Sequence, residues 1–248
     1  IKFVSQSDEI TQLMPHQRRY LEQTLLSFQR NGAELDQLTK KRLVEIESQL
    51  SQKTMDFSKN VVEETDAFEW VTTDESKLAG LPASALASAA QSAKSKELDG
   101  WRFTLQGPSF ISIMTYCDDS SVREYLYTSY ITRASSGDRD NAPLIKEILL
   151  LRKEKATLLG YKDVSDLLLA SRMVKAGQHA QLFVDQLIET TMPFAEQEHQ
   201  ELNHFAQETL KWGRDLEPWD ISYVEEKLKR AECGFDEEAL KPYFEVKS

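Results

Sequence analysis

The feature that most constrains the fold of this chain is a helical apolar periodicity that few residues interrupt. Only nine glycines and seven prolines punctuate its 248 residues. Pro15 stands where the first turn of a helix tolerates proline. Leu21, Leu25 and Phe28 follow it at helical spacing, and Asn31-Gly32 is a suitable C-terminal stop. We therefore predict a mainly α protein with a multi-helix, bundle-like architecture.

A second apolar seam follows this turn and runs for roughly 20 residues at heptad-like steps. Its members are Leu43, Ile46, Leu50, Phe57 and Val61, with Thr54 in the vacant position. Because a turn precedes the seam, we expect an antiparallel helical hairpin with the first helix. A free coiled-coil dimer is the alternative, although its heptads would persist for longer.

The stretch before residue 110 holds the best β signal. Trp101 to Leu105 alternates apolar and polar side chains, as a half-buried strand does, and Gly107-Pro108 ends it. We therefore expect at most a small β element near 101–105. Before it, Thr72 and Glu75 suit a capping box for a short helix over 73–79. Pro82 then opens a helix rich in Ala and Ser, whose small side chains permit close helix approach.

The remaining chain is also expected to be helical, apart from 109–117, which suits either strand or helix. Asp99-Gly100 forms a turn, and we divide the sequence there into a region 1–99 with the helical hairpin and a region 100–248. Further helices are predicted after the N-cap candidates Asp118, Asp119 and Ser120, from Asn141 to Gly160, over 164–171, from Gln178 to Lys211 with an interruption or a kink at Pro193, and from Asp220 to Glu232.

Charge and composition exclude several classes of protein. The net charge of −11, from 30 basic and 41 acidic residues, argues against non-specific nucleic-acid binding. No apolar run is long enough to cross a bilayer, and the first residues lack the pattern of a signal peptide. Cys117 and Cys233 form no disulfide framework, which fits two reduced thiols. We expect a cytoplasmic protein with no membrane or nucleic-acid partner.

No metal-ligand motif is found in the sequence. A zinc hydrolase needs histidines and a carboxylate that converge on one ion, which the helical H-E-x-x-H achieves. The close pair His199 and His204 is five residues apart, or about 140° around a helix, and Gln200 replaces the glutamate. His16 and His179 follow helix-start signals and are expected at the surface. The sequence therefore predicts no catalytic residue and no metal ligand in this segment.

Several short motifs nevertheless occur in a specific order and spacing. They are Trp101, Thr104-Leu105, Pro108-Ser109-Phe110, Ile113 to Cys117, Arg123-Glu124, Tyr127, Thr132 to Ser135, Leu158 to Tyr161, Trp219-Asp220, Tyr223, and Leu240 with Pro242, Tyr243 and Phe244. In this order the chain resembles the thimet oligopeptidase and oligopeptidase A family of zinc metallopeptidases. It departs from the pattern at Val224 and Glu245, neither of which bears on catalytic chemistry.

The resemblance implies a cytosolic, mostly helical zinc endopeptidase that cuts short peptides in a deep channel. In such enzymes the H-E-x-x-H helix and a glutamate on a later helix hold the zinc, and both lie C-terminal to the segment matched here. We therefore expect this segment to be an inactive scaffold and channel-wall portion, with zinc bound only in the full-length parent. Trp219 and Tyr223 are candidate channel residues, although helix packing is the alternative for both.

Two further expectations concern partners. The chain alone would leave apolar surface without its cover, so we expect either self-association of the fragment or an exposed hydrophobic patch near the C-terminal helices. The alternative function is a non-catalytic helical protein-interaction module, with the seam from Leu43 to Val61 as its partner-binding face.

Overall fold

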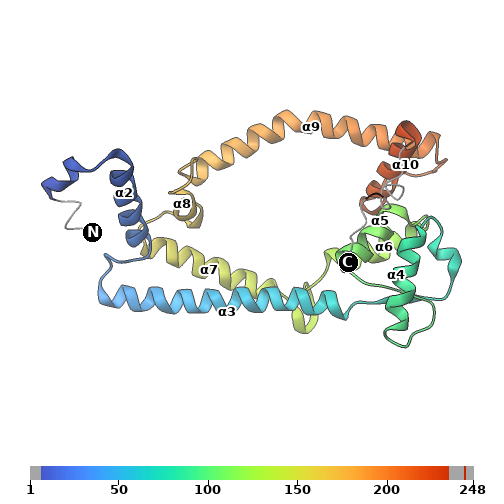
Figure 1. Cartoon of the computed structure of the whole chain (residues 1–248), viewed down its shortest axis with the longest axis horizontal. Coiled ribbons are helices and arrows are strands. Elements are labelled where there is room, and N and C mark those ends of the chain that lie inside the picture. The colour runs from blue at the N-terminus through green and yellow to red at the C-terminus, as the bar shows by residue number, and fades with distance from the viewer. Residues whose placement is uncertain (1–6, 235–242, 244–248) are drawn as a thin grey trace. The chain divides into compact units, whose positions relative to one another are not determined.

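The computed structural model describes residues 7–234 and residue 243, and it is helical along most of that length. The motif residues Leu240, Pro242, Phe244 and Glu245 lie outside the described residues. The helices are α2 (Pro15–Arg30), α3 (Gln37–Ala67), α4 (Ala83–Lys94), α5 (Gly107–Tyr116), α6 (Ser120–Ile131), α7 (Ala142–Leu158), α8 (Val164–Leu169), α9 (Gly177–Glu208) and α10 (Ile221–Cys233) (Figure 1). Short 3₁₀ helices are η1 (Asp8–Gln12), η2 (Glu75–Leu78), η3 (Gly137–Arg139) and η4 (Pro218–Asp220). The predicted mainly α class is confirmed.

The chain is divided into two compact units, and each is made of two separate stretches of sequence. Unit 1 comprises residues 1–58 and 141–187, and unit 2 comprises residues 59–140 and 188–248. The division predicted at residues 99 and 100 falls inside unit 2, and it stays a prediction about the organisation of the whole protein. No helix among the residues described combines the length and hydropathy that crossing a membrane requires.

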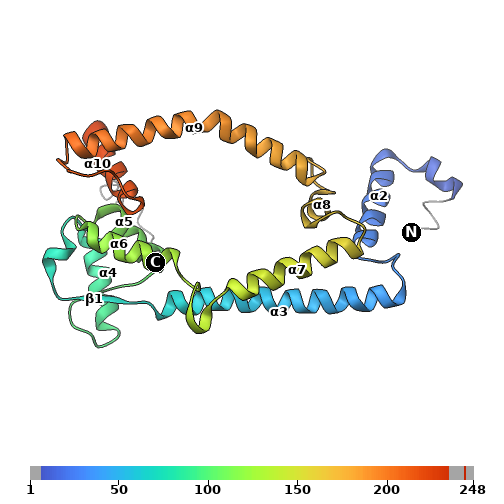
Figure 2. The same ribbon diagram turned by 180° about the vertical axis from the view of Figure 1, so that it is seen from behind.

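In unit 1, α7 lies antiparallel beside the first part of α3 (Figure 1, Figure 2). Buried Leu43 and Ile46 on α3 belong to the predicted seam, and Ile148 and Leu151 are buried on α7. The ion pairs between the two helices are Arg42–Glu154, Glu47–Lys155 and Lys53–Glu147. The antiparallel partner of the seam in unit 1 is therefore α7. The hairpin expected between the first two helices stays a prediction.

Unit 2 contains the small β element. The strand β2 (Trp101–Phe103) pairs antiparallel with β1 (Trp70–Thr72), with Val71 opposite Arg102. The main core of this unit packs α4, β2, α5 and α6 around Phe103, Ile113 and Leu126, each at most 1% exposed. A second cluster joins the end of α9 to α10 through Ala206, Leu216, Tyr223 and Val224.

Two local predictions in unit 2 differ from the structure. The helix expected over 73–79 is the shorter η2, and its cap is Asp74, whose carboxylate accepts from the Ser76 amide at 3.0 Å. Thr72 instead ends β1. The predicted strand ends two residues early, at Phe103. Gly107 and Pro108 begin α5, so the ambiguous segment 109–117 is helical as far as Tyr116 and extended at Cys117. Helix α9 continues through Pro193, so the helix is not interrupted there.

Candidate functional site

The predicted site residues lie in unit 2, beside a fully buried ion pair. Asp119 caps α6 by accepting from the Ser121 amide, which places Arg123 one turn later on the inner face of that helix. Asp220 ends η4, immediately before α10. Both side chains are 0% exposed, and Arg123 Nη2 donates to Asp220 Oδ1 at 2.5 Å. The pair therefore ties α6 to the start of α10.

Each of the three nitrogen atoms of the Arg123 guanidinium group donates a hydrogen bond. Nε donates to the Trp219 carbonyl oxygen at 3.2 Å and Nη1 to the Cys117 carbonyl oxygen at 2.5 Å. Arg214 donates to the second carboxylate oxygen of Asp220 at 2.5 Å. Burial acts to raise the pKa of Asp220, but hydrogen bonds from Arg214 and Arg123 outweigh it, and the net pKa lies below the ordinary value. The carboxylate is therefore ionised and fully engaged in structural contacts.

The predicted channel residue Tyr223 is 7% exposed. Its hydroxyl donates to Asp118 Oδ1 at 2.7 Å, and the Arg123 guanidinium lies 4.2 Å from its ring centroid. The Tyr223 ring is nearly parallel to that of Trp212, with centroids 6.1 Å apart and ring planes 9° apart, and Arg123 also lies 5.8 Å from the Trp212 ring centroid. Burial and the hydrogen bond to Asp118 raise the pKa of Tyr223, so the phenol stays protonated. These contacts fix the Tyr223 ring against both Arg123 and Trp212.

Trp219, the second predicted channel residue, is more accessible than Tyr223. It is half-buried, and its indole Nε1 donates to Ser120 Oγ at 3.3 Å. Its ring centroid is 6.1 Å from that of Tyr127. Trp219 and Tyr223 thus belong to one cluster around the Arg123–Asp220 pair, and both make packing contacts there.

The described residues do not fit a zinc ion. They contain no group of three or more His, Cys, Asp or Glu side chains arranged to hold a metal. His16, His179, His199 and His204 are all exposed, and the last three lie on α9. Because residues five apart on a helix point about 140° away from each other, His199 and His204 do not converge on one ion. We assign no metal-dependent step to any described residue.

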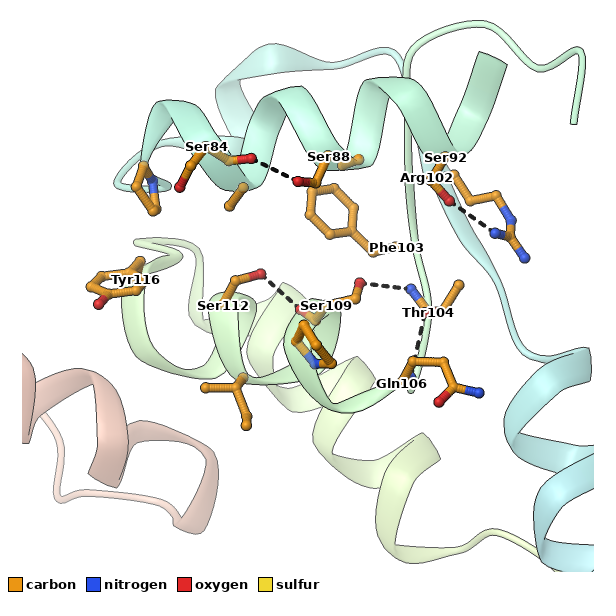
Figure 3. Close-up of a pocket in the computed structure, with 15 residues that line it drawn as sticks. Ser84, Ser88, Ser92, Arg102, Phe103, Thr104, Gln106, Ser109, Ser112 and Tyr116 are labelled. Atoms are coloured by element: carbon orange, nitrogen blue, oxygen red, sulfur yellow. Dashed lines mark hydrogen bonds between the residues drawn. The ribbon is translucent and has the colours of Figure 1, made fainter. Parts of the chain in front are cut away.

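A groove between α4 and α5 stands apart from this cluster (Figure 3). Its volume is about 490 Å³, and Phe103 forms part of its lining. Ser84, Ser88 and Ser92 lie four residues apart on one face of α4, and Ser109 and Ser112 lie opposite them on α5. The sequence showed the small residues of α4 but not the facing helix, which only the fold brings close.

The polar groups of the groove are mostly engaged within it. Ser88 donates to the Ser84 carbonyl oxygen at 2.9 Å, and Ser112 donates to the Ser109 carbonyl oxygen at 2.8 Å (Figure 3). Ser109 Oγ accepts from the Thr104 amide at 3.0 Å. The lining residues include no histidine, cysteine or carboxylate. Because a serine nucleophile needs an adjacent base, the groove has the chemistry of a packing or binding surface, not of a catalytic one.

Comparison with known proteins defines the class to which this fold and these motifs belong. The profile of peptidase family M3 matches residues 113–248. The chain therefore belongs to peptidase family M3, and the resemblance drawn from the ordered motifs is confirmed.

Three relatives place the chain within that family. Oligopeptidase A of Haemophilus influenzae is 40% identical over 234 residues, which cover 92% of this chain and 34% of the relative. Oligopeptidase A of Escherichia coli is 37% identical, covering 96% of this chain and 35% of the relative. A probable cytosolic oligopeptidase A of Arabidopsis thaliana is 32% identical, covering 99% of this chain and 36% of the relative. The chain thus spans about a third of the length of the curated relatives that it matches.

Proposed function

We propose that the chain is the N-terminal scaffold and channel-wall portion of a zinc-dependent oligopeptidase that hydrolyses short peptides. The observation that supports this proposal most is that the chain belongs to family M3 and matches about a third of the length of each relative. In this proposal the zinc ligands belong to the parent enzyme, on an H-E-x-x-H helix and a later glutamate beyond this segment. The chain alone is then inactive and binds no zinc.

The contacts in unit 2 support a scaffold role. Arg123 and Asp220 join helices that are almost 100 residues apart in the sequence, and all three guanidinium nitrogens of Arg123 donate hydrogen bonds there. Within the proposal, Trp219 is the better candidate for contact with peptide, because Tyr223 is nearly covered and its hydroxyl is held by Asp118. The parent enzyme is proposed to be cytoplasmic.

The test compares this chain with the longer polypeptide encoded by the reading frame beyond Ser248. We expect an H-E-x-x-H motif in that frame, and cleavage of a quenched fluorogenic peptide that a chelator abolishes and added zinc restores. The 248-residue chain assayed in parallel is expected to show no cleavage. Chelator-sensitive cleavage by the chain alone, or a continuing frame without the motif, would contradict the proposal.

The second candidate function is a helical interaction module that uses the seam of α3. Leu43 and Ile46 in this seam are 4% and 0% exposed. Since α7 makes the antiparallel contacts there, little of this part of the seam is open to a partner. Light scattering distinguishes the two functions: a stable dimer that Leu50→Asp dissociates would favour the interaction module.

A further inference from the structure

We draw no further inference here: the strongest candidate, the cavity in unit 1 between the C-terminal ends of α2, α7 and α8, carries nothing, because its basic residue Arg30 already donates to the Leu167 carbonyl oxygen at the end of α8, and nothing in the structure shows what would bind the buried Nε atom of Arg30, which has no partner among the described residues.

Discussion

Arg123 donates a hydrogen bond to Asp220, which lies 97 residues later in the sequence, and both side chains are fully buried. Removing one partner of such a pair leaves an uncompensated buried charge, which costs more than the intact pair contributes. The Arg123–Asp220 pair is therefore the contact on which the junction of α6, η4 and α10 depends most.

Replacement of Arg123 tests this dependence. Arg123→Met is expected to lower the free energy of unfolding by about 3–5 kcal/mol, because Asp220 stays buried with Arg214 as its remaining cation. The control is Arg139→Met, which breaks the ion pair between Arg139 and Glu63. The side chains of this pair are 41% and 43% exposed. That loss should be about 0–1 kcal/mol in urea denaturation. Similar decreases in the free energy of unfolding in both variants would show that the buried pair stabilises the fold no more than the exposed pair does.

The stability of the chain should fall in acid in a way that depends on Asp220. Burial raises the pKa of Asp220, but hydrogen bonds from Arg214 and Arg123 lower it by more than burial raises it. The pKa in the folded chain therefore lies below the unfolded value. The unfolded chain then binds the proton more readily, and this stabilisation is present above about pH 4 and lost as the pH falls through the folded pKa.

Asp220→Asn is the variant for this measurement. The free energy of unfolding of the native chain should rise more steeply with pH than that of the variant, between about pH 2 and pH 5. Parallel profiles for the two proteins would show that Asp220 does not contribute to the pH dependence.

The two cysteines should differ strongly in reactivity. Cys117 is 0% exposed, and burial raises its pKa to about 11. Cys233 is exposed near the end of α10. With iodoacetamide at pH 8, we expect Cys117 to react at least about tenfold more slowly than Cys233. Mass spectrometry of the alkylated peptides measures both rates, and in guanidinium chloride the difference should vanish. Rapid modification of Cys117 in the folded chain would be inconsistent with this core.

Gly100 is required by the approach of its backbone to β1. Its φ is +87°, and a Cβ atom there would lie 2.2 Å from the Thr72 carbonyl oxygen. Gly100→Ala should therefore lower the free energy of unfolding by about 2 kcal/mol or more. Gly107→Ala is the control, because Gly107 begins α5 with open space around it and should change stability by less than about 1 kcal/mol. Equal effects would contradict the strand pairing.

Helix positions could be predicted well because their signals are local. Pro15 and Asp119 start α2 and α6 where the sequence indicates. The strand β1 was missed, because three residues are too few to establish an alternating pattern, and its partner β2 lies about 30 residues away. The segment 109–117 could not be assigned, since α5 has apolar residues on several sides, including buried Ile113 and exposed Ile111.

The candidate site could be predicted only in part, because its contacts are long-range. Trp219 and Tyr223 were identified as aromatic residues of one element, yet their partners Ser120 and Asp118 lie about 100 residues earlier. No local pattern reports such a distance. The groove between α4 and α5 depends in the same way on a facing helix that sequence spacing alone does not locate.

The central claim is that this segment is a scaffold of a family M3 peptidase whose zinc ligands lie elsewhere. The most direct measurement is the zinc content of the purified 248-residue chain after dialysis, by mass spectrometry of the metal, together with a peptidase assay. The account predicts far less than one zinc per chain and no chelator-sensitive cleavage. One tightly bound zinc per chain with chelator-sensitive peptidase activity would contradict it.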